Sequence, residues 1–220
     1  MTAFLDEAEQ HGPLAALVNN AGIMPISRML EEDDAATARI LAVNLGGVIT
    51  GSREAARRMV GHGGGHLVNV ASTAGKAGLV GLSTYCATKA AVIAFSEAIE
   101  QELAPHGVHV SVVLPGIVRT ELAVGVPELR GVPSITPAQV AEAVAETLVS
   151  PRFEVYVPRV MGPLLTWTRL LPHRAGLRLA RAMGAQDIFL DATEHPDRAA
   201  YEARVAARPV QTTAGVSTEK

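Results

Sequence analysis

Residues 14–22 read LAALVNNAG, a short apolar run followed by a polar segment that ends in glycine. Short runs rich in β-branched residues and bounded by Gly, Pro or polar residues are typical of buried strands. The sequence predicts four such strands, at residues 14–19, 66–71, 108–114 and 153–157. Longer stretches with helical spacing of apolar residues separate them, at 34–60, 83–105 and 137–149. This alternation predicts an α/β fold with a parallel sheet.

Polar or glycine-rich segments follow three of the predicted strands. They are NNAG at 19–22, STAG at 72–75 and PGIVRT at 115–120. Sheets of this class bind ligands at the carboxyl ends of their strands. The sequence therefore predicts a binding site where these three segments meet.

The composition is that of a globular protein of 220 residues, with 48% hydrophobic and 19% charged residues and a net charge of -3. These values exclude a disordered chain, collagen and a coiled coil, and they give no overall basic field for nucleic acid. The acidic opening MTAFLDEAEQ is unlike a signal peptide. A single cysteine, Cys86, excludes an internal disulfide and any Cys-based metal site, and we expect it to be a packing residue of a cytoplasmic protein.

Tyr85 and Lys89 lie four residues apart on a predicted helix and therefore share a face. A neighbouring ammonium lowers the pKa of a phenol, which is about 10 when unperturbed. A shift to about 7 needs roughly 4 kcal/mol, more than one exposed cation supplies, so a second positive charge or burial is required. An oxidised nicotinamide would supply that charge. The alternative is an accidental pair on a solvated helix.

Ser72 and Asn44 each have a structural and a functional interpretation. Ser72 follows a buried strand and either satisfies a turn or hydrogen-bonds a substrate oxygen. Asn44 lies within a predicted helix, where it either braces a kink near Gly46 and Gly47 or holds a water molecule.

The order of these features, NNAG at 19–22, Asn44, Ser72, YxxxK at 85–89 and PGxxxT at 115–120, resembles the short-chain dehydrogenase/reductase family. The resemblance covers residues 14–158. It implies a Rossmann-like, doubly wound parallel sheet. It also implies NAD or NADP as cofactor and a small carbonyl or alcohol compound as substrate.

The resemblance implies a role for each matching residue. Tyr85 would be the general acid/base, and Lys89 would lower its pKa and bind the nicotinamide ribose. Ser72 would polarise the substrate oxygen, and Asn44 would hold a water that links Lys89 to solvent. Three residues would lie near the adenosine-side ribose, Asn20, Ala21 and Gly22. The nicotinamide carboxamide and nearby phosphate would be held by the segment that contains Gly116, Val118 and Thr120.

The family's first strand is followed by a T-G-x-x-x-G-x-G loop that cradles the cofactor pyrophosphate, and the 220 residues contain no such segment. We therefore expect an incomplete sheet that lacks two βα units and leaves the strand at 14–19 as an open edge, prone to aggregation or domain swapping. A late start codon and a genuine fragment are competing explanations. We expect weak or no binding of nicotinamide nucleotides by this chain. The alternative function is a catalytically inactive regulatory or assembly partner.

The expected organisation is a partial Rossmann-like catalytic domain at 1–158, a helical C-terminal extension at 159–208 and a disordered tail at 209–220. Residues 163–183 combine leucines with arginines and contain no acid, although Pro172 interrupts them. A basic amphipathic segment of this kind can lie on a membrane surface, but we expect it to pack over the substrate cleft or against a subunit, which explains the same pattern. A homodimer or homotetramer would associate through the helices at 34–60 and 83–105.

Two further segments have plainer interpretations. Residues 61–66, GHGGGH, join a helix to a strand, so they are predicted to be a turn with solvated His62 and His66, not a phosphate loop or a metal site. Residues 79–82 and 121–133 are mainly apolar and are expected to line a pocket for a lipophilic ketone or secondary alcohol.

Overall fold

The computed structural model describes residues 1–128, 133–182, 184 and 188–207. Four parallel strands form one sheet in the order β1-β2-β3-β4. Each predicted strand is confirmed with ends shifted by at most two residues. The strands are β1 (Ala16–Asn19), β2 (Gly65–Val70), β3 (Val108–Pro115) and β4 (Glu154–Val157).

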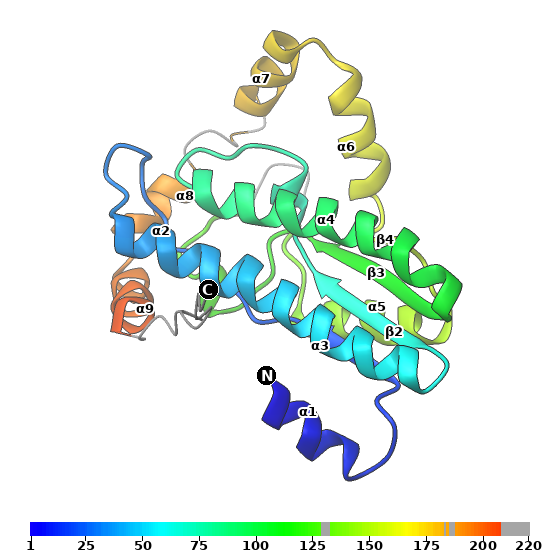
Figure 1. Cartoon of the computed structure of the whole chain (residues 1–220). Coiled ribbons are helices and arrows are strands. Elements are labelled where there is room, and N and C mark those ends of the chain that lie inside the picture. The colour runs from blue at the N-terminus through cyan, green and yellow to red at the C-terminus, as the bar shows by residue number, and fades with distance from the viewer. Residues whose placement is uncertain (129–132, 183, 185–187, 208–220) are drawn as a thin grey trace, which may run out of the picture.

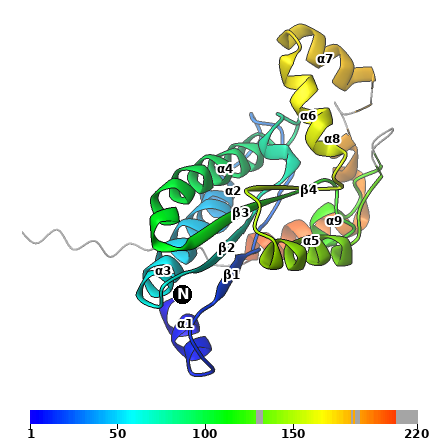
Figure 2. The same cartoon turned by 90° about the vertical axis from the view of Figure 1, so that its right-hand side faces the viewer.

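Helices cover both faces of this sheet, as the α/β prediction requires. Figures 1 and 2 show α3 (Gly47–Gly61) and α4 (Ser83–Leu103) on one face and α5 (Pro137–Val149) on the other. Alternate strand residues face the two layers, so Leu67 packs on the α3 side while Val68 packs with Val140 of α5. The short first helix, α1 (Thr2–Glu9), buries Leu5 beneath α3.

The predicted helix at 34–60 is not continuous. It consists of α2 (Asp34–Leu41), a π-helical segment (Ala42–Gly46) and α3. Asp33 caps the start of α2 by accepting a hydrogen bond from Ala36 N. A π-helical turn inserts an extra residue into a helix and is often found at functional sites. Here the insertion surrounds Asn44, which is fully buried.

The start of α5 agrees closely with the sequence. Thr136 and Gln139 form a capping box, and Pro137 occupies the first helical position, where its missing N–H costs nothing. The predicted helix at 83–105 is also found, with its last residues in a 3₁₀ turn that ends at Gly107 in a left-handed conformation.

A buried polar network ties the sheet to the helices on one face. Asn19 of β1 donates to Asn69 Oδ1 of β2 (2.8 Å), and Asn69 donates to Ser96 Oγ of α4 (2.9 Å). Ser52 of α3 contacts both asparagines. Because buried amides need partners, this network fixes how β1, β2, α3 and α4 pack.

The segment at 61–66 forms the predicted turn, with Gly63 and Gly64 at positive φ. His62 is about half exposed and lies 3.2 Å from Glu9, in line with a solvated residue. The prediction for His66 is wrong, because its side chain is buried, with Nε2 2.8 Å from Ser111 Oγ. Burial lowers its pKa and keeps the ring neutral. β2 begins at Gly65, one residue before the predicted start, so His66 lies within the strand and not at its exposed end.

The C-terminal extension is helical, as expected. It comprises α6 (Met161–Leu170), α7 (His173–Ala182), α8 (Ile188–Asp191) and α9 (Pro196–Ala207). Pro172 separates α6 from α7, and these two helices project from the sheet beyond α4 (Figures 1 and 2). The predicted tail at 209–220 lies outside the described residues.

Within the described part of the chain, β1 pairs only with β2, so its other side is the open edge that the sequence predicted. Val18 on this strand is 38% exposed.

No helix among the described residues is long and apolar enough to cross a bilayer.

Candidate active site

A cavity of about 1300 Å³ lies at the carboxyl ends of the strands, where the sequence placed the site. Its wall includes residues from the segments that follow β1, β2 and β3. The same cavity extends along α6 and α7. Among the described residues there is no cluster of side chains suited to a metal ion.

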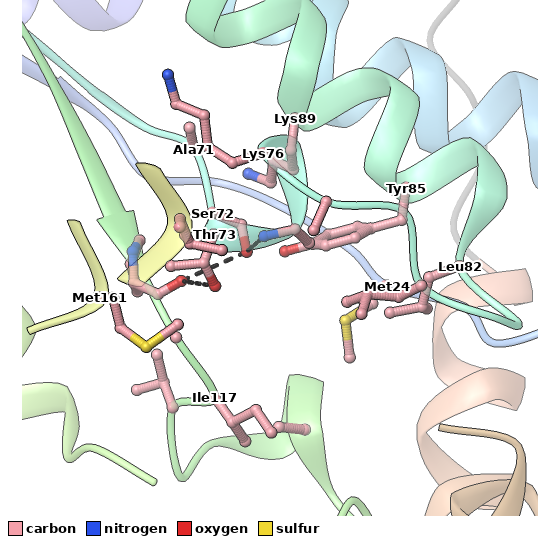
Figure 3. A pocket seen from close by; sticks show the side chains of 18 of the residues that line it. Met24, Ala71, Ser72, Thr73, Lys76, Leu82, Tyr85, Lys89, Ile117 and Met161 are labelled. Atoms are coloured by element: carbon pink, nitrogen blue, oxygen red, sulfur yellow. Dashed lines mark hydrogen bonds between the residues drawn. The ribbon is translucent and has the colours of Figure 1, made fainter. Parts of the chain in front are cut away.

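Ser72, Tyr85 and Lys89 meet in this cavity (Figure 3). Ser72 follows β2, and its hydroxyl accepts from Ala74 N (3.1 Å) and donates to Pro115 O (3.4 Å). The Ser72 hydroxyl therefore satisfies a turn, which was one of its two predicted roles, and the side chain also faces the cavity. Figure 3 shows the Tyr85 phenol pointing toward Ser72.

Lys89 lies one turn beyond Tyr85 on α4 and is only 4% exposed. Its ammonium donates to Val70 O (2.9 Å) at the end of β2 and lies 5.8 Å from the centre of the Tyr85 ring. Gly75 allows this packing, because a Cβ there would lie 2.8 Å from the Lys89 backbone carbonyl. Burial lowers the pKa of Lys89 to about 8, so the side chain remains mainly cationic at neutral pH.

Burial has the opposite effect on Tyr85. It raises the pKa of the phenol to about 12, and hydrogen bonding from Ser72 only partly offsets the rise. The expectation that burial is one route to a lower pKa of Tyr85 is wrong, because burial disfavours the phenolate. The neutral phenol is thus the stable form, and the phenolate requires further positive charge beside it.

Asn44 braces the loop after β1. Its Oδ1 accepts from Ile23 N (2.8 Å) and its amide nitrogen donates to Ile23 O (2.9 Å). Its partner is thus the loop after β1, whereas the structural interpretation placed the brace at a kink near Gly46 and Gly47. It does not line the cavity itself. A Cβ at Gly22, however, would lie 3.5 Å from Asn44 Oδ1 and 3.6 Å from Lys89 Nζ. Gly22 therefore leaves a small polar space between the amide and the ammonium.

All eight residues expected to contact a cofactor line the cavity, Tyr85 and Lys89 among them. On the β3 side, Gly116 N donates to Val157 O (2.8 Å) and Thr120 N donates to Val118 O (2.8 Å), which fixes that segment. The two segments contribute Asn20, Ala21 and Gly22 after β1 and Gly116, Val118 and Thr120 after β3.

The donors present fit the nicotinamide half of a dinucleotide. Lys89 has three N–H donors, and Val70 O is its one hydrogen-bond acceptor within the described residues. Its remaining donors would be available to ribose hydroxyls, and the space without a Cβ at Gly22 leaves the backbone open to a close approach.

The rest of the cavity wall is mainly apolar. Leu79, Val80 and Leu82 line it, as the sequence predicted for 79–82, and so do Leu122 and Ala123 from the segment at 121–133, of which residues 129–132 lie outside the described part. Residues of the segment at 163–183 also line the cavity, which agrees with the predicted packing over the substrate cleft. The residues of the C-terminal extension that line the cavity include Met161, Leu164, Leu165, Thr168, Leu171, Leu177 and Phe189.

Sequence reasoning also missed a clamp formed by α9. The Arg198 guanidinium is buried and donates to Leu122 O (2.8 Å) and to Met24 O, while Tyr201 accepts from Met24 N (3.0 Å). Both carbonyls belong to cavity-lining residues. An arginine in a polar, exposed-looking sequence gave no signal of this burial.

Cys86, by contrast, is a packing residue as predicted, and burial raises the pKa of its thiol.

A parallel α/β sheet with Ser72, Tyr85 and Lys89 together at its strand ends defines a protein of the Rossmann-like class. The chain belongs to the short-chain dehydrogenase family, whose model matches residues 1–130. It is similar in fold to the crystal structure of a short chain dehydrogenase from Burkholderia cenocepacia J2315 in complex with NADP. That likeness has a TM-score of 0.69 and 26% identity, and it covers 83% of this chain and 76% of the other.

Curated relatives match over part of their length. Probable oxidoreductase EphD of Mycobacterium tuberculosis is 44% identical over 114 residues, which are 51% of this chain and 19% of the relative. Galactitol 2-dehydrogenase (L-tagatose-forming) of Cereibacter sphaeroides is 40% identical over 126 residues, 56% of this chain and 49% of the relative. The chain thus spans about a fifth to a half of the length of these two relatives.

Proposed function

We propose that this protein is an NAD(P)-dependent oxidoreductase that interconverts a lipophilic carbonyl compound and its secondary alcohol. The observation that carries the proposal is the meeting of Ser72, Tyr85 and Lys89 in a mainly apolar cavity at the carboxyl ends of the strands. The family membership and a structural relative solved with NADP support the choice of cofactor.

In the proposed reduction, Ser72 hydrogen-bonds the substrate oxygen and the Tyr85 phenol donates its proton to that oxygen. The nicotinamide, when bound, supplies the hydride that the carbonyl carbon accepts. Because burial keeps Tyr85 protonated, the site is suited to act as a general acid at neutral pH. In the reverse direction the phenol must first lose its proton, which the Lys89 ammonium favours.

Lys89 and Asn44 have supporting roles in this proposal. The Lys89 ammonium holds the nicotinamide ribose and stabilises negative charge on Tyr85. The space at Gly22 is suited to a water between Asn44 Oδ1 and Lys89 Nζ, which would return protons to the site.

The lipophilic substrate is inferred from the cavity wall. It is not taken from the relatives, because the galactitol dehydrogenase, for one, acts on a polar compound by name. Leu79, Leu82 and Ile117 near the catalytic group, together with α6, offer few polar partners to a polyol. A polar substrate would leave its hydroxyls unpaired there, at a cost of about 1–3 kcal/mol each.

The proposal includes a homodimer or homotetramer that associates through α3 and α4, in a cytoplasmic protein. Light scattering of the purified chain measures the association state. Substitution of exposed residues on these two helices should then reduce it.

The reaction is tested with a reduced cofactor deuterated at the nicotinamide carbon that transfers hydride. The protein is incubated with lipophilic ketones, and the products are analysed by mass spectrometry. Deuterium at the carbinol carbon supports the proposal. Absence of product at millimolar cofactor, with assembly intact, would instead favour the non-catalytic regulatory or assembly partner.

A further inference from the structure

One side of α6 is apolar and exposed, although the helix also forms part of the cavity wall. Trp167 and Leu170 are 71% and 73% exposed, and Val160 just before the helix is 65% exposed. With Pro163, which is also exposed, these residues recur every three or four positions and so form one stripe along the helix. We call Val160, Pro163, Trp167 and Leu170 the α6 stripe. The cavity-lining residues Met161, Leu164 and Leu165 lie between its members in sequence.

The chain around the α6 stripe is strongly basic. Residues 155–186 contain five arginines and no aspartate or glutamate. Arg174, Arg178 and Arg181 on α7 are exposed and are spaced on one side of the helix. None of the three forms an ion pair within the described part of the structure. Gly176 and Leu177 of the same helix line the cavity, so the cavity wall and the basic side belong to one short helix.

We propose that α6 and α7 bind the surface of an anionic lipid bilayer. The α6 stripe enters the boundary between headgroups and acyl chains, where tryptophan is favoured, and the three arginines of α7 contact the headgroups. The basic charge selects this partner over a second copy of the chain, because pairing two such surfaces would bring like charges together. Helices of ten residues lie in the interface and do not span it.

Membrane binding by α6 and α7 would also affect how substrate reaches the active site, and this second step rests on the proposed function. With the stripe in lipid, the cavity on the other side of α6 lies close to the membrane surface. A lipophilic substrate then reaches the site from the bilayer with little passage through water. The lipid binding itself does not depend on that step.

The chain offers a direct probe, because Trp167 is its single tryptophan. We expect its fluorescence to shift to shorter wavelength with vesicles of phosphatidylcholine and phosphatidylglycerol, and the protein to float with them. Vesicles of phosphatidylcholine alone should give neither effect, and added salt should weaken the binding. Absence of both the shift and flotation would overturn the proposal, whatever the result of the activity assays.

Two pairs of variants locate the surface. Each arginine near an anionic membrane contributes about fivefold to binding, so Arg174→Gln with Arg178→Gln should weaken it about 25-fold. Arg28→Gln with Arg152→Gln, two exposed arginines that lie outside α3, α4, α6 and α7, is the matched control and should leave it unchanged. Equal binding by both pairs would overturn the proposal.

The apolar contribution is tested by Leu170→Ser, which keeps Trp167 as the probe. The control is Leu30→Ser, which removes a still more exposed leucine, 94% against 73%, from the loop before α2. Only the first should reduce flotation. If light scattering without vesicles shows instead that Leu170→Ser dissociates an oligomer, the α6 stripe is a protein interface and the proposal is wrong.

Discussion

Replacing Lys89 with methionine should raise the free energy of unfolding at pH 7. The side chain is 4% exposed, and burial lowers its pKa from 10.5 to about 8. Each unit of pKa shift corresponds to about 1.4 kcal/mol, so keeping this lysine charged in the folded protein costs about 3 kcal/mol. Methionine removes that cost, while loss of the hydrogen bond to Val70 O costs about 1–2 kcal/mol. We expect a net gain of about 1–2 kcal/mol, together with loss of activity.

The sign of the pH dependence follows from the same shift. Below pH 8 the lysine is protonated in both the folded and the unfolded chain, and between about 8 and 10.5 only the unfolded chain holds the proton. The free energy of unfolding of the wild type therefore rises with pH in this window. The methionine variant lacks this contribution, so its advantage should shrink by about 2 kcal/mol between pH 7 and about 9.5.

Urea unfolding of both proteins at the two pH values measures this difference. Comparison of the two proteins at each pH cancels the titration of all other groups. A variant that is less stable than the wild type by the same amount at both pH values would refute the reasoning. In that case Lys89 would be stabilised by its contacts and not strained by burial.

Three further predictions concern the site and its supports. Gly22→Ala should lower turnover about tenfold with less than about 1 kcal/mol change in stability, since its methyl group fills the space beside Lys89; steady-state kinetics and thermal unfolding check this. Arg198→Met should lower the free energy of unfolding by about 2–4 kcal/mol in urea, because two buried carbonyls lose their donor, whereas Arg204→Met at an exposed ion pair should cost less than about 0.5 kcal/mol. Alcohol oxidation should accelerate about tenfold per pH unit between about pH 6 and 7.5, because the Tyr85 phenol must lose a proton, and should level off near pH 8, where Lys89 loses the charge that favours the phenolate; a flat profile below pH 7.5 would contradict the assignment of the base.

Local signals in the sequence were sufficient for the sheet and for the place of the site. β-Branched runs bounded by Gly or Pro gave the four strands, and the helix predicted at 137–149 has the bounds of α5. The ordered motifs predicted that Ser72, Tyr85 and Lys89 share one cavity. Each of these features depends on residues close together in the chain, or on the general rule that parallel strands end at one edge.

Features that depend on distant contacts were not predictable. The π-helical segment around Asn44 forms where the amide holds Ile23, 21 residues away. Arg198 reaches Met24 across 174 residues, and nothing in the sequence near α9 signals that contact. The direction of the Tyr85 pKa also depends on how deeply the ring is buried, which spacing along a helix does not reveal.

The central claim, that the Tyr85 hydroxyl is the proton donor, is tested most directly by Tyr85→Phe. Turnover of a lipophilic ketone is measured at millimolar reduced cofactor, with Tyr156→Phe as the matched control, because that hydroxyl bonds Glu154 outside the cavity. We predict that Tyr85→Phe lowers kcat about 100- to 10,000-fold while thermal unfolding and association state stay as in the wild type, and that Tyr156→Phe retains turnover. Wild-type turnover in Tyr85→Phe would contradict the account.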